Sequence, residues 1–275
     1  MAQRRILCLH GMGGSGQILK AQLGTSTNAV TSTPAPLLSK LSSREQHFEF
    51  VFPDGPIETK SPGPGLSAML ADAGPFHSWF TWPGDQGNSS ASESPALQKP
   101  PTTADVATVR DAIEELYDLA DEYGPFDGVF GFSQGATLAA GWLMRHERRW
   151  QATGPVLDVM TPSPELARFV VLFNAYGIGI AEVEEAMMEG SEGGSSDEED
   201  KEETRSGAIR LTTPSLHVCG RRDSFLAGSM ALLDACDPGT ASCVMHDGGH
   251  VVPRDPRTVN EIARAIEALM HRAVM

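Results

Sequence analysis

The sequence has few basic residues and no long run of apolar residues. Its 21 lysines and arginines are outnumbered by 36 aspartates and glutamates, and basic residues do not cluster with aromatic ones, so we expect no binding to nucleic acid. No apolar run approaches the roughly 18–20 residues that a membrane-spanning helix needs. The first residues enter a predicted strand without the apolar stretch and cleavage site of a signal peptide, which predicts a cytoplasmic protein.

Cysteine is also rare, and the four cysteines present show no metal-binding spacing. Cys8, Cys219 and Cys243 fall in or beside predicted strands, and Cys236 closes a predicted helix. We therefore expect buried, reduced thiols rather than metal ligands. The chemistry predicted below requires no metal ion and no organic cofactor.

Segments with strand character alternate with helical segments along the 275 residues, which predicts one α/β domain with a mostly parallel central sheet and helices on both faces. The clearest helix is 103–122. Thr103 can cap its N-terminus, and apolar residues recur along it at helical spacing. The expected strands are 5–9, 48–52, 127–131, 166–174, 215–219 and 241–246. The expected helices are 15–22, 36–43, 103–122, 134–147, 225–235 and 256–272.

Two irregular insertions interrupt this alternation, near residues 84–101 and 177–207, and the whole stretch 59–101 is predicted to lack regular structure. Most of the net charge of −15 lies in the second insertion, because residues 182–203 carry eleven acidic residues and one lysine. Such a segment cannot bury apolar area, so residues 189–206 are expected to form a disordered acidic insertion. A solvated loop without function is one interpretation, and a lid hinge or a phosphorylation target is the other.

The pentapeptide Gly131-Phe132-Ser133-Gln134-Gly135 carries the G-x-S-x-G pattern between a predicted strand and a predicted helix. In this setting the pattern is typical of a nucleophilic serine on a sharp turn. The turn is crowded, so the residues that flank the serine must be small, and glycine meets that need on both sides. A serine at the start of a helix also lies close to N–H groups that favour developing negative charge. We therefore predict that Ser133 is a nucleophile.

A nucleophilic serine needs a histidine base and an acid that orients it, and in this architecture the acid and then the histidine follow the serine along the chain. Asp223 comes just after the predicted strand 215–219, and His250 comes just after the strand 241–246. Open α/β sheets hold their active sites at the carboxyl ends of the strands. The sequence thus predicts a catalytic set of Ser133, Asp223 and His250.

The negative charge that develops on the substrate oxygen needs backbone N–H donors, which form an oxyanion hole. The residue after the nucleophile supplies one donor, so Gln134 is the first candidate. The second should come from the glycine-rich loop 10–16, where Met12 is the preferred candidate and Gly11 and Gly13 are alternatives. A phosphate-binding loop is the competing interpretation, but this loop lacks the Lys-Ser/Thr pair and the G-x-G-x-x-G spacing of such loops.

A loop-like stretch carries three large aromatic residues: Trp79, Phe80 and Trp82. They suit the wall of a substrate pocket for an apolar acyl chain, and they suit equally a small core beneath the loop. Tyr176, just after the strand 166–174, is a further candidate for substrate binding. Three other histidines are expected to be structural: His10, His77 and His217.

Five segments occur in a characteristic order: Leu9-His10-Gly11, Phe52-Pro53-Asp54-Gly55-Pro56, Gly131-Phe132-Ser133-Gln134-Gly135-Ala136, Ser215-Leu216-His217-Val218-Cys219-Gly220 and Gly248-Gly249-His250-Val251-Val252-Pro253. This series resembles the FSH family of serine hydrolases, which are α/β-hydrolases found widely in fungi. The resemblance covers almost the whole chain. It implies a single α/β-hydrolase domain over residues 1–275 and a triad of Ser133, Asp223 and His250.

Within this family the chain looks most similar to small hydrolases encoded with fungal polyketide synthases. That similarity implies a serine esterase or thioesterase that releases or edits a polyketide acyl chain on an acyl carrier domain, in secondary metabolism. A general carboxylesterase for short or medium acyl esters is the alternative within enzymes, and a non-catalytic ligand-binding protein is the alternative outside them. Arg221 and Arg222, which precede Asp223, have two interpretations. In the first, one of them contacts the phosphate of the carrier's phosphopantetheine; in the second, both are simply solvated.

Overall fold

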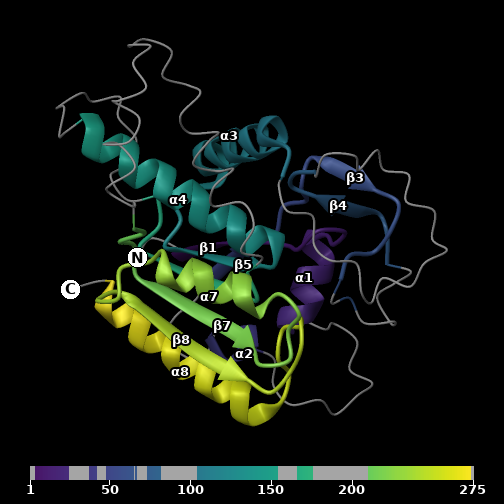
Figure 1. Cartoon of the computed structure of the whole chain (residues 1–275), viewed down its shortest axis with the longest axis vertical. Helices are drawn as coiled ribbons and strands as arrows, with labels where there is room; N and C mark the ends of the chain where they lie inside the picture. Colours follow the sequence, from purple (N-terminus) through teal and green to yellow (C-terminus); the bar gives the residue numbers. More distant parts are fainter. Residues whose placement is uncertain are drawn as a thin grey trace.

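The computed structural model describes residues 4–24, 37–41, 48–64, 66, 73–81, 104–153, 166–175 and 210–273. Their centre is a six-stranded parallel sheet in the order β2-β1-β5-β6-β7-β8, covered by helices (Figure 1). Its strands are β1 (Arg4–Leu9), β2 (Phe48–Val51), β5 (Gly128–Phe132), β6 (Phe169–Phe173), β7 (Ser215–Gly220) and β8 (Ala241–His246). The helices are α1 (Gly16–Leu23), α2 (Leu37–Leu41), α3 (Val106–Tyr123), α4 (Gln134–Thr153), α7 (Leu226–Asp234) and α8 (Pro256–Arg272). The predicted α/β fold with a parallel sheet is confirmed.

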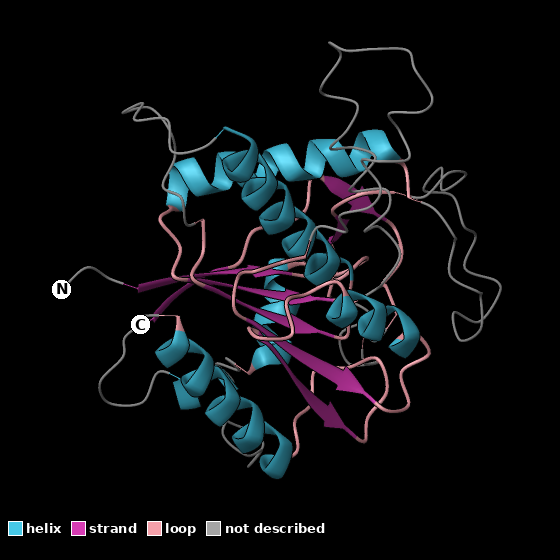
Figure 2. Ribbon diagram, turned by 60° about the vertical axis from the view of Figure 1, so that its left-hand side comes forward, coloured by secondary structure: helices cyan, strands magenta, loops and turns pink. Residues whose placement is uncertain are grey.

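Strand β1 shows why helices cover both faces of the sheet. Leu7 and Leu9 belong to one hydrophobic cluster, which includes α3, α4 and α7. Ile6 and Cys8 belong to the other, which includes α1, α2 and α8. All four side chains are buried, and a parallel strand that is apolar on both faces needs helices on both. Figure 2 shows the two helical layers on either side of the strands.

The start of α3 differs from the prediction, although the end of the helix agrees with it. The helix begins at Val106, and its N-cap is Asp105, whose side chain accepts the N–H of Ala107 at 3.1 Å. The prediction that Thr103 caps the helix is therefore wrong. The backbone N–H of Asp105 donates to the Thr81 carbonyl at 2.8 Å, so a tertiary contact fixes which of two good capping residues begins the helix.

The stretch 59–101 is not irregular throughout, contrary to the prediction. Strand β4 (Phe76–Ser78) pairs antiparallel with β3 (Ile57–Thr59), and this hairpin lies beside the main sheet (Figure 1). His77 also forms a β-bridge with Gly14, through hydrogen bonds of 2.6 and 3.2 Å between their backbones. The hairpin is therefore joined to the glycine-rich loop that follows β1.

Three of the four cysteines are buried as predicted: Cys8, Cys219 and Cys236. Cys243 is exposed, contrary to the prediction, because β8 is the edge strand of the sheet. All four are free thiols.

The predicted insertions near 84–101 and 177–207, with the acidic segment 189–206, lie outside the described residues. In the described part of the chain, no helix has both the length and the apolar character needed to cross a bilayer.

Candidate active site

Ser133 lies on a sharp turn between the carboxyl end of β5 and the first residue of α4. Its backbone φ is +54°, which is uncommon for a residue other than glycine. The flanking glycines allow this turn through close packing. A Cβ added to Gly131 would lie 2.5 Å from the Ala136 Cα, and one added to Gly135 would lie 2.4 Å from the Leu9 carbonyl oxygen. The small residues of the pentapeptide are therefore required by the geometry of the turn.

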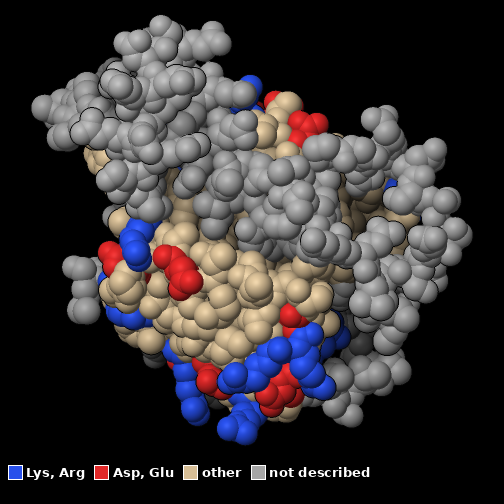
Figure 3. Space-filling model, viewed as in Figure 1, with Lys and Arg blue, Asp and Glu red and all other residues tan. Residues whose placement is uncertain are grey.

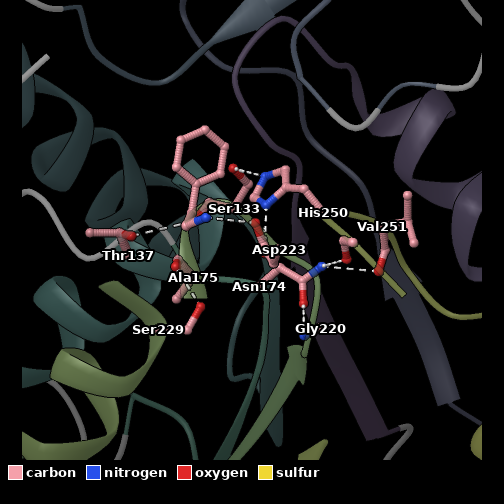
Figure 4. Close-up of polar contacts among 11 residues, drawn as sticks. Ser133, Thr137, Asn174, Ala175, Gly220, Asp223, Ser229, His250 and Val251 are labelled. Carbon is pink, nitrogen blue, oxygen red and sulfur yellow. Dashed lines mark hydrogen bonds and ion pairs between the residues drawn. The ribbon is translucent and has the colours of Figure 1, made fainter. Parts of the chain in front are cut away.

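The structure brings Ser133, His250 and Asp223 together in one hydrogen-bonded line at the carboxyl edge of the sheet (Figure 4). Nε2 of His250 lies 2.8 Å from Oγ of Ser133, and Nδ1 of His250 lies 2.8 Å from Oδ2 of Asp223. The His250 and Asp223 side chains are only 8% and 1% exposed. Because a carboxylate faces Nδ1, that nitrogen carries the proton, and Nε2 is left to accept the proton of Ser133. This is the arrangement of a nucleophile, a base and an orienting acid.

Neighbouring groups hold both Asp223 and the His250 ring. Oδ1 of Asp223 accepts the backbone N–H of Phe225 at 2.8 Å, so both carboxylate oxygens have a partner. The rings of Phe225 and Phe132 lie with their centroids 4.7 and 5.2 Å from that of His250. Both aromatic rings therefore pack against the imidazole, in a tilted and an edge-to-face arrangement.

The loop after β1 presents a backbone N–H group for the expected oxyanion hole. The N–H of Gly13 donates to Oγ of Ser78 at 3.2 Å, so this alternative donor is already occupied. The N–H groups of Met12 and Gln134, by contrast, have no acceptor among the described residues. The backbone N–H groups of Met12 and Gln134 therefore remain free to donate to a ligand. The contact between Ser78 and this loop was not predicted from the sequence.

His10 holds the same loop in place, in keeping with its expected structural role. Its Nδ1–H donates to the Gly11 carbonyl at 2.8 Å, and its Nε2 accepts the N–H of Gly55 at 2.9 Å. Burial lowers the pKa of His10 to about 4, so the ring is neutral at pH 7. Asp54 accepts the N–H of Gly16, at the start of α1, at 2.7 Å. The Asp-Gly-Pro segment thus supports the glycine-rich loop.

Gln134 has a second role, because its side chain holds the backbone of the predicted aromatic pair. Oε1 accepts the N–H of Trp79 and Nε2 donates to the carbonyl of Phe80, both at 2.8 Å. Trp79 and Phe80 are 0% and 1% exposed and belong to a hydrophobic core cluster. The structure therefore favours the core interpretation for these two residues over the pocket wall. The other two candidates lie outside the described residues: Trp82 and Tyr176.

Arg221 and Arg222 lie at the carboxyl end of β7, and both contact Asp247. The Arg221 Nε is 3.5 Å from the Asp247 carboxylate, and the Arg222 Nε donates to the Asp247 backbone oxygen. The Arg221–Asp247 pair is largely exposed, so it contributes little to stability. Figure 3 shows basic and acidic side chains mixed around the carboxyl end of β8 and the adjacent end of α8. This edge of the visible face is therefore mixed in charge rather than purely basic.

A second contact between a histidine and a nucleophilic side chain lies inside the fold. Nε2 of His217, in β7, is 3.4 Å from Sγ of Cys236 and 3.3 Å from Oγ of Ser215. Burial lowers the pKa of His217 to about 4 and raises that of Cys236 to about 11, so both groups are neutral at pH 7. A buried neutral thiol is not an activated nucleophile, which agrees with a structural role for His217. Among the described residues, no group of three or more His, Cys, Asp or Glu side chains could hold a metal ion.

Because His10 and His217 are buried and neutral, we expect the folded state to lose stability in mild acid. Both have a folded pKa of about 4, below the value of 6.5 for a free histidine, so the unfolded state binds more protons between these limits. Their contribution is complete above about pH 6.5 and is lost as the pH falls towards 4, by on the order of 3 kcal/mol for each histidine. Urea unfolding across this pH range measures the loss.

His217→Gln provides the control for this prediction, because glutamine keeps a polar group near Ser215 and Cys236 but does not titrate. The slope of the unfolding free energy against pH should fall by about 1.4 kcal/mol per pH unit, which corresponds to one proton. An unchanged slope between pH 6.5 and 4 would show that protonation of His217 is not part of the acid sensitivity.

Asn174 is the residue of the site that sequence reasoning missed. It follows β6, is fully buried and has a φ of +45°. Its side chain hydrogen-bonds to the backbone on both sides of His250 and to Gly220, the last residue of β7. A single asparagine belongs to no motif, so the only available signal is a polar residue at the carboxyl end of a central apolar strand.

Three features together define an α/β-hydrolase. The parallel sheet is covered on both faces, the serine lies on a left-handed turn between a strand and a helix, and the aspartate and the histidine follow later strands. A family model described as serine hydrolase (FSH1) matches residues 1–262, and the chain belongs to this family of serine hydrolases. The resemblance inferred from the sequence is confirmed.

Several fungal proteins are similar to the chain over almost its whole length. "Esterase FPY3" of Fusarium mangiferae is 30% identical over 98% of this chain and 99% of its own length. "Hydrolase phiM" of Talaromyces stipitatus is 28% identical over 98% of this chain and 88% of its own. "Dihydromonacolin L-[lovastatin nonaketide synthase] thioesterase" of Aspergillus terreus is 29% identical over 98% and 93%. The chain is therefore a serine hydrolase with esterase and thioesterase relatives.

Solved structures agree with this fold. Esterase PE8 superposes with a TM-score of 0.55 at 18% identity, covering 98% of this chain and 93% of that one. Acyl-protein thioesterase 2 of Zea mays gives a TM-score of 0.51 at 15% identity, covering 98% and 95%. At these identities the likeness shows the α/β-hydrolase fold alone.

Proposed function

We propose that this serine hydrolase cleaves an acyl thioester or ester through Ser133, His250 and Asp223, and that its substrate is a polyketide acyl chain on a carrier domain. The observation that carries the proposal is the hydrogen-bonded line of the three side chains, with 2.8 Å at both contacts. The names of two relatives support an alcohol or a thiol as the leaving group, since one is named an esterase and the other a thioesterase of a nonaketide synthase.

In the first half of the reaction, Oγ of Ser133 attacks the acyl carbon while Nε2 of His250 takes the hydroxyl proton. Asp223 holds the Nδ1–H of His250 and stabilises the imidazolium that forms. The carbonyl oxygen becomes an oxyanion, which the N–H groups of Met12 and Gln134 bind. As the C–S or C–O bond breaks, the imidazolium gives its proton to the departing thiolate or alkoxide, which leaves the acyl group on Ser133.

In the second half, water cleaves the acyl-enzyme. Nε2 of His250 takes a proton from the water as its oxygen attacks the acyl carbon, and the same N–H donors bind the second oxyanion. Oγ of Ser133 then leaves and recovers the proton from His250. The products are a carboxylic acid and a thiol or alcohol, and the enzyme returns to its starting state.

The experiment that tests the substrate class compares matched pairs of substrates over a range of chain lengths. Each pair joins one acyl group to N-acetylcysteamine as a thioester and to an alcohol as an oxoester, with Ser133→Ala as the control. The proposal predicts higher kcat/KM on long or β-keto thioesters. Equal or higher kcat/KM on short oxoesters would overturn the polyketide assignment and indicate a general carboxylesterase.

A fluorophosphonate probe separates an active enzyme from a binding protein that only retains the hydrolase fold. The probe forms a covalent bond with a serine oxygen that a base activates. The proposal predicts labelling of the wild-type chain at Ser133 and none of the Ser133→Ala variant. A wild-type chain that resists the probe and turns over no acyl substrate would favour the binding protein.

A further inference from the structure

Asn174 occupies the point at which the three parts of the site meet. It follows β6, which lies between the strand that carries Ser133 and the strand that leads to Asp223. The carbonyl of the preceding residue, Phe173, accepts the backbone N–H of Ser133 at 2.9 Å. The N–H of Asn174 itself donates to the Val218 carbonyl in β7 at 2.8 Å. The backbone of this corner therefore connects the nucleophile turn to β7.

The Asn174 side chain adds a second connection, because its amide bonds to the loop that carries the histidine (Figure 4). Nδ2 donates to the carbonyl of Gly249 at 3.2 Å and to that of Val251 at 3.0 Å, on either side of His250. Oδ1 accepts the N–H of Gly220, at the end of β7, at 3.1 Å. The Asn174 side chain is fully buried, and its bond to Gly220 is buried with it, whereas the bonds to Gly249 and Val251 are partly buried.

The position places two demands on its residue, and asparagine meets both. The φ of +45° lies in the left-handed region, which asparagine and glycine adopt more readily than other residues. The side chain must also donate twice and accept once. An aspartate of the same shape could accept the N–H of Gly220, but as a carboxylate it would face two carbonyl oxygens with no proton to donate.

We propose that Asn174 is a positioning residue, whose amide holds the loop around His250 against the end of β7 so that the imidazole spans Ser133 and Asp223. The inference rests on the proposed function, because it requires His250 to act as the base. A base works only within hydrogen-bond reach of the proton it takes, and a misplacement of about 1 Å can lower the rate about 100-fold.

Asn174→Gly is the most direct variant, because glycine tolerates the left-handed backbone while the side chain and its amide are removed. Glu147→Ala is the matched control. Glu147 lies near the end of α4 and also accepts three hydrogen bonds, from the Thr212 N–H and from the N–H and hydroxyl of Thr213 before β7. It therefore ties one segment to another, as Asn174 does, but at the amino edge of the sheet and away from Ser133.

For Asn174→Gly we expect kcat on an acyl ester to fall about 10- to 100-fold with KM within about threefold of the wild type. The rate of Ser133 labelling by a fluorophosphonate should fall in parallel. Glu147→Ala should lower the melting temperature and leave kcat within about twofold, since it does not touch the site. If Asn174→Gly lowers the melting temperature but keeps kcat within twofold, Asn174 is merely structural and the proposal is overturned.

Asn174→Asp keeps the test decisive if the glycine variant fails to fold. It should show the same fall in kcat, and the added negative charge beside the His250 loop should raise the apparent pKa of the acidic limb of the kcat/KM profile. An unshifted profile with normal kcat would count against the proposal. Ser133→Ala in the same assay reports on the proposed function alone, so a failure of that function is distinguishable from a failure of the Asn174 proposal.

Discussion

Ser133→Ala is expected to lower kcat for acyl-ester hydrolysis by about 10⁴- to 10⁶-fold, with the fold retained. The variant removes the attacking oxygen and nothing else, because the backbone N–H of Ser133 still donates to the Phe173 carbonyl. Steady-state kinetics measure the loss, and circular dichroism with a thermal melt checks the fold. A folded variant that retains more than about a hundredth of the wild-type kcat would show that Ser133 is not the nucleophile.

The double variant Ser133→Ala with His250→Ala sharpens this expectation. The effects on kcat of removing side chains that act as one unit are not additive. Once the nucleophile is absent, removal of the base should therefore lower kcat little further. If the second substitution lowered kcat by a further large factor, His250 would have a role in the residual reaction that does not depend on Ser133.

Asp223→Asn is expected to lower kcat about 10⁴-fold, although it changes only one atom of the side chain. The amide can still accept the Phe225 N–H through its oxygen, which leaves its NH₂ group facing Nδ1 of His250. That group donates to Nδ1 and so favours the tautomer with the proton on Nε2, which cannot accept the proton of Ser133. The measurement is kcat across the neutral pH range.

Asp127→Asn serves as the control for the same chemical change at the opposite edge of the sheet. Oδ2 of Asp127 accepts the backbone N–H of Arg5 at 3.1 Å, a bond that an asparagine oxygen can also accept. Its kcat should remain within about twofold of the wild type. If Asp223→Asn also kept kcat within about twofold of the wild type, Asp223 would not be the residue that orients His250.

The sequence was sufficient to predict those helices and strands whose signals lie within their own residues. Helix α8 spans the predicted 256–272, because Asp255 caps it, Pro256 begins it and one apolar face continues through it. The β3–β4 hairpin was missed because each strand has only three residues, and its stability depends on pairing with the loop after β1. Thr103 and Asp105 are both good caps, so the contact with Thr81 was needed to choose between them.

The candidate site divides in the same way. Ser133, Asp223 and His250 could be predicted because the chain order and the strand ends follow a known architecture. Trp79 could not be assigned from the sequence, because an aromatic residue in a loop suits a pocket wall or a core, and only its burial separates the two. The role of Asn174 depends on bonds to backbone atoms more than forty residues away, which leave no pattern in the sequence.

Three side chains around the site, those of Asn174, Gln134 and His10, bind backbone atoms of neighbouring segments rather than their side chains. A backbone carbonyl or N–H is the same whatever residue carries it. Replacements in those segments that keep the backbone path can therefore change the shape and polarity offered to an acyl group and leave the catalytic geometry intact. The architecture thus separates the freedom to acquire new substrates from the constraints of the chemistry, which makes the chain a suitable starting point for directed evolution.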